Sequence, residues 1–587
     1  MRSPKNHKGM LRSFKIFLKS IKHHRTPIII SVVLTVASAI LSLFIPKLLG
    51  DMTTIAINSY PEIDWSALGQ KAIIIIILFC GSAILQYGQS YILAIVSARY
   101  TKELREKILD KISRLPISYF DKHQYGDTLS RMSNDVDVLT TSMSQEIADI
   151  SMSLTTLIGT MIIMLTINIP LSLITFVVVP ISVVVVARIM HYAQKYFRDQ
   201  QNTLGVLNSK IEEDYSGQIV IKSNSYEDDA LADFNRTNEK LTTVSRKAQI
   251  FSSLSFPVTH IFTNLGYVAV CILGGVFVVR GQINIGDIQA FIQYVSRFNR
   301  PITEIASTTS TLQSLLAASE RIFDFLDEEE EEPDLVPAKT IEKVKGEVEF
   351  CDVSFGYTKD RTIIKNFSVK VKPGMKVAIV GPTGAGKTTI INLLMRFYDP
   401  DSGYITVDGV PTREMKRADV RKMFGMVLQD TWLFSGTVEE NLRYGNQSAS
   451  LEEIKRATKM SNVSHIIEAL PKGYKSLISE DSDNISAGEK QLITIARAVI
   501  SNPPMMILDE ATSNVDTRTE QLIQDSFEKL TSGRTSFVIA HRLSTIRNSD
   551  LILVMKDGNI VEQGNHDELL KLGGFYAELY NSQFAEN

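Results

Sequence analysis

Long stretches without a charged side chain restrict what the first half of this chain can form. From Ile150 to Ala187 the sequence has no Lys, Arg, Asp or Glu over 38 residues. About 20 apolar residues are enough for a helix to cross the core of a bilayer, so this stretch can supply two crossings. Pro170 in "NIP" disfavours one continuous helix, and we expect the break there. These features predict an all-α membrane domain.

Four further stretches extend the pattern to about residue 330. Three are strongly apolar, and the fourth is weaker because it contains four charged residues. The six predicted spans are Ile28–Phe44, Ala72–Ala98, the two halves of Ile150–Ala187, Ala248–Val279 and a stretch from about Ile285 to Ile305.

The basic residues of this half orient the predicted spans. Lys and Arg concentrate before residue 26, in 99–147 and in 188–247, whereas the other connections are short or poor in them. The positive-inside rule then places both termini in the cytosol of a multi-pass protein of the cell membrane. The two long cytosolic connections predict helices that project beyond the bilayer. "MLRSFKIFLKSI" (10–21) predicts an amphipathic elbow helix at the membrane surface.

An acidic run, "DEEEEEPD" (327–334), separates this region from the rest. Like charges repel and Pro333 stops a helix, so we expect a solvated connector. Beyond it, short apolar runs alternate with helical stretches, as in an α/β sheet. The predicted organisation is a membrane domain at 1–330, an acidic linker at 331–342 and one cytosolic domain at 343–587.

A glycine-rich loop follows the first apolar strand of the cytosolic domain. "VAIVGPTGAGKTT" (377–389) fits the pattern G-x-x-x-x-G-K-[ST], in which backbone N–H groups surround phosphate oxygens. A lysine then reaches the outer phosphates and a hydroxyl binds Mg²⁺. The predicted nucleotide-binding residues are Gly381, Pro382, Thr383, Gly384, Ala385, Gly386, Lys387, Thr388 and Thr389.

Two acids end a later apolar strand, "PMMILDEATSNVD" (504–516). Asp509 is placed to hold Mg²⁺, and Glu510 to polarise an attacking water. His541 follows another strand, "TSFVIAHR", and is a candidate contact for the terminal phosphate, although a lone His after a strand is more often structural.

Taken together, these motifs resemble those of the ATP-binding cassette (ABC) family over essentially the whole chain. The resemblance implies ATP and Mg²⁺ as cofactors and extends to further positions. Tyr357 matches the aromatic residue that stacks on adenine, Gln429 matches the glutamine that touches Mg²⁺ or the lytic water, and His541 matches the switch histidine. "ISAGE" (485–489) matches the signature, which implies that Ser486 and Gly488 face the γ-phosphate held by a partner. Asp516 matches the loop at the dimer interface.

The same resemblance implies a second half-transporter. Ala487 and Glu489 depart from the usual signature, whereas Glu510 is intact, which resembles the catalytically complete subunit of bacterial heterodimeric exporters. We therefore favour a heterodimer over a homodimer. The expected function is ATP-driven export of an amphiphilic drug, lipid or peptide by alternating access, with no nucleic-acid partner. An ATP-gated channel or a regulatory membrane protein is the alternative.

Two features of the membrane half bear on coupling and cargo. The resemblance implies a coupling helix near Tyr125–Ser130 and a second one within 217–228. Arg297, Arg300 and Glu304 share one face of the weak sixth span. They form either an internal Arg–Glu pair or, with His260 and Asn264, a site for an anionic group of the cargo.

Overall fold

The computed structural model describes residues 19–428, 431–479, 485–509, 516–540 and 542–584. By its internal contacts the chain divides into two compact units. The first runs to Ser113 and resumes at Tyr125–Glu328, and the second consists of Arg114–Gln124 and the chain from Glu329 onward. Most of the elbow helix expected at 10–21 lies outside the described residues, and a short 3-10 turn covers Ile21–His24.

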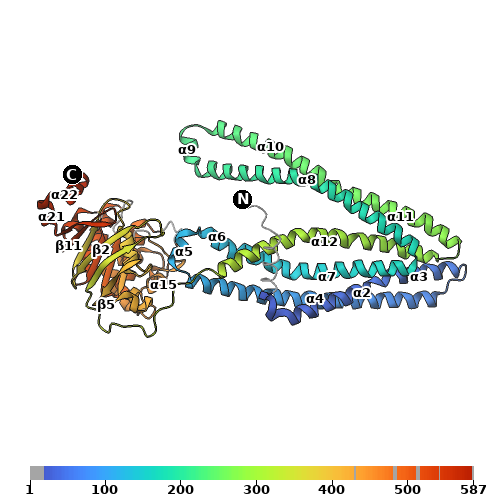
Figure 1. Ribbon diagram of the computed structural model, residues 1–587, viewed down its shortest axis with the longest axis horizontal. Coiled ribbons are helices and arrows are strands. Elements are labelled where there is room, and N and C mark those ends of the chain that lie inside the picture. The colour runs from blue at the N-terminus through green and yellow to red at the C-terminus, as the bar shows by residue number, and fades with distance from the viewer. Residues whose placement is uncertain (1–18, 429–430, 480–484, 510–515, 541, 585–587) are drawn as a thin grey trace. The chain divides into compact units, whose positions relative to one another are not determined.

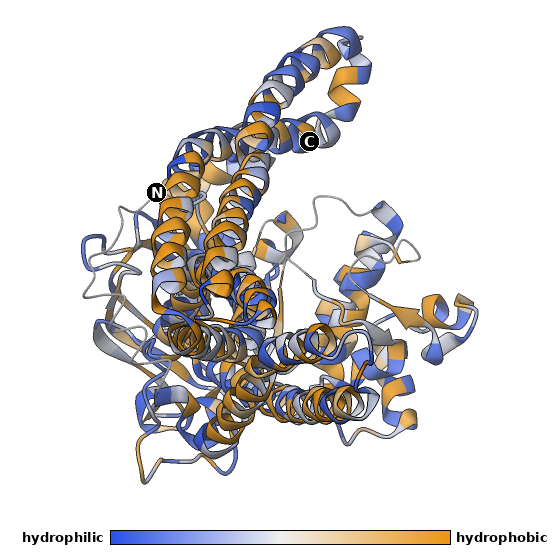
Figure 2. Ribbon diagram, turned by 90° about the vertical axis from the view of Figure 1, so that its right-hand side faces the viewer, coloured by the Kyte–Doolittle hydropathy of each residue, from blue (hydrophilic) through white to orange (hydrophobic). Residues whose placement is uncertain are grey.

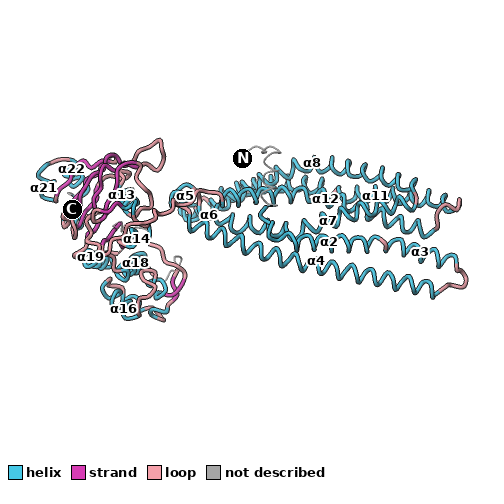
Figure 3. The backbone as a smooth tube through the Cα atoms, turned by 60° about the horizontal axis from the view of Figure 1, so that its bottom comes forward, coloured by secondary structure: helices cyan, strands magenta, loops and turns pink. Residues whose placement is uncertain are grey.

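In the part of the chain that the structure describes, the first unit is built from helices alone (Figures 1 and 3). They are α2 (Arg25–Leu43), α3 (Ile45–Asn58), α4 (Trp65–Arg114), α6 (Tyr125–Ser130), α7 (Val136–Ile167), α8 (Ile169–Ser216), α9 (Gln218–Ser223), α10 (Glu227–Ser253), α11 (Ser255–Val279) and α12 (Ile285–Leu326). The helices α4 and α8 have 50 and 48 residues. At 1.5 Å per residue each is about 70 Å long, more than twice the hydrocarbon core, as the long connections predicted.

The break predicted at "NIP" separates α7 from α8. Asn168 has an extended backbone, with φ −161° and ψ 116°, and its side-chain oxygen accepts a hydrogen bond from the N–H of Leu171 at 3.1 Å. Pro170 lies in the first turn of α8, where a missing N–H leaves no helical bond unmade. The expected interruption is therefore confirmed, and the cap explains its position.

Five helical segments among the described residues are long and apolar enough to cross a membrane. They are Ile21–Asn58, Trp65–Arg114, Thr128–Ile167, Ile169–Ser216 and Glu227–Val279. Hydrophobic residues run along the long helices in Figure 2, and many are exposed: Ile73, Ile76 and Ile77 each expose more than half of their surface. Such residues suit contact with lipid. The sixth span, on α12, is not among the five and stays a prediction.

The charged residues that weaken α12 as a span have partners. Asp287 forms an ion pair with Lys47 of α3, and Arg300 donates to Glu304 at 2.7 Å. Ionisable side chains inside a membrane pair in this way because an isolated charge there is costly. The internal pair expected among Arg297, Arg300 and Glu304 therefore forms between Arg300 and Glu304.

Arg297 instead contacts backbone at the junction of α2 and α3. Pro46 has no N–H and cannot donate to the carbonyl of Ser42 as a continuous helix would. Arg297 Nη1 donates to that carbonyl oxygen at 2.7 Å, and the Tyr294 hydroxyl donates to the carbonyl of Leu43, also at 2.7 Å. Side chains of α12 thus bind carbonyl groups at the helix break, where lipid offers no hydrogen bonds.

The second unit contains a six-stranded sheet of order β12-β11-β3-β10-β9-β6, in which all neighbours are parallel except β12 and β11. A four-stranded antiparallel sheet has the order β2-β1-β4-β5. The strands are β1 (Val348–Phe355), β2 (Ile364–Val371), β3 (Lys376–Val380), β4 (Ser402–Val407), β5 (Val410–Pro411), β6 (Phe424–Val427), β7 (Gly436–Thr437), β8 (Leu477–Ile478), β9 (Met505–Asp509), β10 (Thr535–Ile539), β11 (Leu551–Lys556) and β12 (Asn559–Gly564). The predicted α/β domain is confirmed.

Among the described residues from Lys387 onward, the second unit contains ten α-helices. They are α13 (Lys387–Leu394), α14 (Arg417–Lys422), α15 (Val438–Arg443), α16 (Leu451–Met460), α17 (Ser464–Ala469), α18 (Ala487–Ser501), α19 (Thr517–Thr531), α20 (Leu543–Arg547), α21 (His566–Leu572) and α22 (Phe575–Phe584). Successive side chains of a strand point to opposite faces. In β3, Val377 and Ile379 join a core that includes α13, whereas Ala378 and Val380 join one that includes α18 and α19. The helices α13 and α18 therefore lie on opposite faces.

The acidic segment after α12 binds to the second unit, contrary to the solvated connector expected from its charge. The Asp334 carboxylate lies 3.3 Å from Arg417 Nη1 and 3.6 Å from Arg396 Nη1. Glu331 lies 2.8 Å from Arg421 Nη2. The side chains of Arg396 and Arg417 are only 5% and 10% exposed. Repulsion within the acidic run is offset by these arginines, which the sequence places far along the chain.

One short helix between α4 and α6 also belongs to the second unit. This helix, α5 (Ile117–Lys122), carries Asp121, whose carboxylate accepts a hydrogen bond from the Tyr398 hydroxyl. The helix predicted at Tyr125–Ser130 is present as α6, but it belongs to the first unit. The predicted helix is therefore present, and its role in coupling stays a prediction.

Candidate functional site

The loop between β3 and α13 has a backbone that requires glycine. Gly381, Gly384 and Gly386 have φ values of +154°, +83° and +101°. L side chains rarely adopt such values. A Cβ at Gly381 would lie 2.3 Å from the carbonyl oxygen of Met555, and one at Gly386 would lie 2.7 Å from Ile364 Cδ1. The loop can follow this path only with glycine at these positions.

Lys387 opens α13 and folds back over the loop. Its Nζ donates to the carbonyl oxygens of Gly381 at 2.8 Å and Pro382 at 3.1 Å. Burial lowers the pKa of Lys387, and the carboxylate of Asp509, at the end of β9, opposes this shift. The structure therefore brings the loop, the lysine and Asp509 together, and leaves the side chain of Thr388 exposed beside them. An ammonium group beside a loop of N–H groups suits a phosphate chain.

Tyr357 is held against the helix that follows the glycine loop. Asn392 donates to its hydroxyl at 3.0 Å, and that hydroxyl donates to Thr389 at 3.3 Å. Its ring meets those of Phe355 and Tyr398 at centroid distances of 5.1 and 5.0 Å. The aromatic side chain expected to contact a base is thus fixed by the helix that carries the lysine.

Ser486 is the N-cap of α18, the signature helix. Its hydroxyl accepts from the N–H of Glu489 at 3.3 Å, and the Glu489 carboxylate accepts from the N–H of Ser486 at 2.7 Å. This reciprocal pair is a capping box. The departure at Glu489 therefore has a local structural role, because its carboxylate turns back onto the backbone. Gly488 is buried in the first turn, and Ala487 is exposed.

Asp516 caps the next helix, α19. Its carboxylate accepts from the N–H groups of Arg518 at 3.1 Å and Thr519 at 3.0 Å. The hydrogen bonds with Thr519 lower the pKa of Asp516, so the side chain stays ionised at neutral pH. The structure shows Asp516 on the surface in a capping role.

Three predicted catalytic residues, Gln429, Glu510 and His541, lie outside the described residues. Among the residues that are described, no group of three or more His, Cys, Asp or Glu side chains could hold a metal ion.

Arg497 was missed by the sequence analysis. It lies in α18 and donates to the carbonyl oxygens of Trp432 at 2.6 Å and Asn441 at 2.8 Å. Its guanidinium also lies over the rings of Phe434 and Tyr444, which stack at 4.2 Å. Burial lowers the pKa of Arg497. Arg497 thus connects the signature helix to the segment that follows Gln429. The sequence feature that could have revealed it is a charged residue within the apolar run "TIARAVI".

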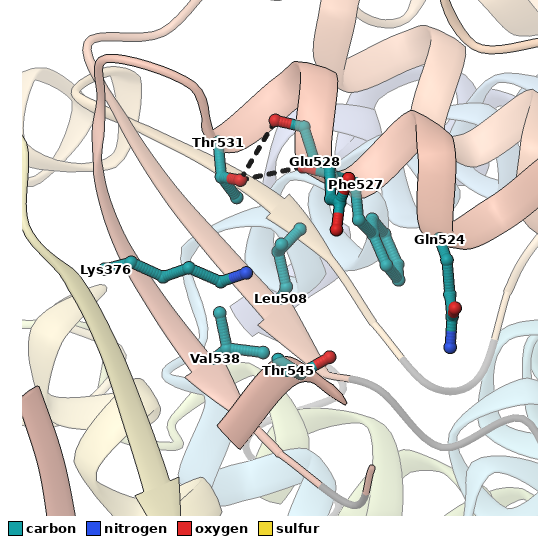
Figure 4. Close-up of a pocket in the computed structure, with 8 residues that line it drawn as sticks. All are labelled: Lys376, Leu508, Gln524, Phe527, Glu528, Thr531, Val538 and Thr545. Carbon is teal, nitrogen blue, oxygen red and sulfur yellow. Dashed lines mark hydrogen bonds between the residues drawn. The ribbon is translucent and has the colours of Figure 1, made fainter. Parts of the chain in front are cut away.

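A small cavity lies beneath α19, on the sheet face that also carries α18 (Figure 4). Its lining includes Leu508 and Val538 from the strands and Lys376, whose side chain extends toward it. On the helix side, Thr531 donates to the carbonyl of Phe527 at 2.9 Å. The volume is about 30 Å³, which is space for water but not for a nucleotide.

Comparison with known proteins agrees with both units. Residues 28–302 match the family described as ABC transporter transmembrane region, and residues 364–513 match the family described as ABC transporter. A fatty acid ABC transporter ATP-binding/permease protein of Mycobacterium bovis is 44% identical, over 88% of this chain and 82% of that protein. A putative multidrug export ATP-binding/permease protein of Bacillus subtilis is 35% identical, over 85% of this chain and 86% of that protein.

An ATP-dependent lipid A-core flippase of Syntrophus aciditrophicus is 33% identical, over 88% of this chain and 85% of that protein. The matched regions correspond to the helical unit and to the domain that carries the glycine loop, Lys387 and the signature helix. This chain therefore belongs to the ABC transporter family, as an exporter-type ATP-binding/permease protein that couples ATP hydrolysis to transport across a membrane.

Proposed function

We propose that this chain is one half of a dimeric exporter that moves an amphiphilic cargo out of the cytosol by alternating access. One observation supports the proposed dimer: the helix after the glycine loop and the signature helix lie on opposite faces of the same sheet. A triphosphate held by Lys387 would meet Ser486 of a second cassette packed head to tail. Each ATP would then stabilise the closed pair of cassettes.

Within this proposal one set of residues binds ATP and Mg²⁺, and a second set carries out the hydrolysis. The aromatic ring binds adenine, the loop binds the phosphates, and Mg²⁺ neutralises phosphate charge. The assigned nucleotide contacts are Tyr357, Gly381, Pro382, Thr383, Gly384, Ala385, Gly386, Lys387, Thr388 and Thr389, with Ser486, Gly488 and Asp516 supplied across the interface; Mg²⁺ is assigned to Thr388, Gln429 and Asp509, and hydrolysis to Glu510, His541 and Gln429.

The direction of transport follows from a difference in ATP affinity between the open and the closed state of the two cassettes. Both termini are cytosolic in this arrangement, α12 is the sixth span, and the domains follow the predicted boundaries at 330 and 342. We favour a heterodimer, because the altered signature at Ala487 and Glu489 occurs together with the catalytic acid Glu510. A homodimer is the alternative, and co-purification with the product of a neighbouring half-transporter gene separates the two.

The nucleotide assignments are tested with two substitutions in the full-length protein. Lys387→Ala should weaken ATP binding at least tenfold, because the ammonium group that lies against the loop is lost. Glu510→Gln should keep ATP binding but lose most turnover, about 100-fold or more. Binding and ATPase assays in proteoliposomes check both. Near wild-type hydrolysis by Glu510→Gln would remove that residue from its assigned role.

The first cargo to test is an amphiphile with one carboxylate. The relative at 44% identity is named for fatty acids, and the bond from Arg297 to Ser42 occupies one of the five donors of its guanidinium. We expect a fatty acid to stimulate ATP hydrolysis more than its methyl ester does. Arg297→Ala should abolish that preference, whereas Tyr294→Phe, which removes a neighbouring cap without a charge, should keep it. Equal stimulation by acid and ester would contradict a carboxylate-selective site.

A further inference from the structure

Tyr398 touches two parts of the second unit that have different tasks. On one side its ring meets Tyr357, the residue assigned to adenine, at a centroid distance of 5.0 Å and an interplanar angle of 87°. It also meets Phe355 at 5.3 Å. On the other side its hydroxyl donates to the carboxylate of Asp121 on α5. One side chain therefore bridges the proposed base site and a helix that the chain joins to α4 and α6.

Several hydrogen bonds hold the turn that carries Tyr398. It follows α13 directly, and Arg396 has a left-handed backbone with φ +52°, which an arginine adopts only when its surroundings hold it there. The Arg396 guanidinium donates to the carbonyl oxygens of Thr412 at 3.0 Å and Met415 at 2.7 Å. The N–H of Phe397 donates to the carbonyl of Asn392 at 2.9 Å. A shift of α13 would therefore move this turn as well.

The α5 side of the bridge is equally ordered. Tyr119 is 5% exposed and stacks on His123, with ring centroids 4.2 Å apart. The N–H of His123 closes the helix on the carbonyl of Tyr119 at 3.1 Å. Burial raises the pKa of the Tyr398 hydroxyl, and the Asp121 carboxylate adds to this shift, so the phenol remains the donor. The bridge is thus a charge-assisted hydrogen bond, which is stronger than a neutral one.

We propose that Tyr398 is a positioning residue that couples occupation of the base-binding face of Tyr357 to the attachment of α5. This inference rests on the proposed role of Tyr357 in ATP binding. A base stacked on Tyr357 restrains that ring, the ring edge restrains Tyr398, and the hydroxyl restrains α5. Coupling of this kind is reciprocal, so attachment of α5 raises the affinity for a nucleotide by the same factor. A ligand that carries phosphates but no base lacks this effect.

The test compares two ligands on the full-length protein in lipid nanodiscs. One is Mg²⁺ with the non-hydrolysable ATP analogue adenylyl imidodiphosphate, and the other is Mg²⁺ with inorganic tripolyphosphate. Tyr398→Phe keeps the ring and removes the hydroxyl, and Asp121→Asn removes the charge of the acceptor. Each should weaken binding of the adenine nucleotide about fivefold, at the low end of measured couplings. Neither should change binding of tripolyphosphate.

The double variant should bind no more weakly than either single one, because both substitutions break the same bond. Tyr474→Phe is the matched control, because it removes a hydroxyl of the same unit that lies 2.7 Å from Thr458. In hydrogen exchange, the nucleotide should protect the amides of 117–122 in the wild type and not in Tyr398→Phe.

Three results would overturn the inference: an unchanged nucleotide affinity in Tyr398→Phe, an equal loss for both ligands, or additive losses in the double variant. Failure of the proposed function looks different. In that case the wild-type protein itself would not bind the adenine nucleotide, or Lys387→Ala would bind it normally.

Discussion

In the proposed dimer, a phosphate would approach the start of α18, where Ser486 and Glu489 form the capping box. At the position of Glu489 the family usually has glutamine, whose amide oxygen can accept the same hydrogen bond and complete the capping box. The glutamate closes it with a carboxylate, 2.7 Å from the N–H of Ser486. The helix is capped in either case, but only the glutamate adds a negative charge where an anion should bind.

Glu489→Gln should therefore strengthen ATP binding without loss of the fold. A charge at a helix N-terminus contributes about 0.5–1 kcal/mol, so we expect the KM for ATP to fall about two- to fivefold. Steady-state ATPase measurements on the reconstituted protein check this. Glu489→Ala is the control, because it also removes the acceptor for the N–H of Ser486 and should cost about 1 kcal/mol of stability. An unchanged KM in Glu489→Gln would show that the carboxylate does not face the bound phosphate.

At the scale of elements, the same capping chemistry begins several helices of the second unit. In α16 the Glu453 carboxylate accepts from the N–H of Ser450 at 2.7 Å and from its hydroxyl at 2.8 Å. These bonds lower the pKa of Glu453, the backbone bond most. Because the folded-state pKa is the lower one, the cap stabilises fully above the ordinary carboxyl pKa. That contribution is lost as the pH falls through the folded value.

Because the pKa of Glu453 is lowered in the folded protein, we predict that acid destabilises the first turn of α16. Glu453→Gln can keep a cap but cannot titrate, so the thermal midpoint of the wild type should fall relative to that of the variant between about pH 6 and pH 4. Differential scanning fluorimetry of the two proteins over this range is the measurement. Parallel midpoints at every pH would mean that the Glu453 cap does not survive in solution.

At the scale of the whole molecule, the acidic segment leaves little free chain between the last long helix and the nucleotide domain. The helix α12 ends at Leu326, and Glu331 is already bound to arginines of the second unit. Asp334 contacts the buried Arg396 and Arg417. A connection held by ion pairs transmits displacement along the chain better than a flexible one.

Asp334→Ala should leave these arginines without one acceptor and destabilise the nucleotide domain by about 2 kcal/mol, below the cost of breaking a fully buried pair. The thermal midpoint should then fall by about 5 °C. Lys339→Ala breaks an exposed ion pair with Glu414 in the same segment and should change stability by less than about 1 kcal/mol. Equal effects of the two substitutions would show that the segment is only a tether.

Much of this architecture could be predicted from local pattern. Hydrophobic length predicted the five segments that are long and apolar enough to cross a membrane, and the spacing of Gly381, Gly386 and Lys387 predicted the glycine-rich turn between β3 and α13. Local sequence failed for contacts between distant segments. Asp334 and Arg417 are 83 residues apart and Asp121 and Tyr398 are 277 apart. No periodicity connects such pairs, so the acidic run was expected to be solvated and the contact between Asp121 and Tyr398 was not foreseen.

The sequence by itself therefore determined the class of the protein and the loop for phosphate, because glycine conformations, helix caps and bilayer thickness act over a few residues to one helix. Only the tertiary structure decided that Arg297 binds a helix break, that the acidic segment forms ion pairs with arginines and that Tyr398 contacts both Tyr357 and Asp121 of α5. Those contacts depend on which surfaces meet once the sheet and helices have packed, and burial then makes each pairing matter.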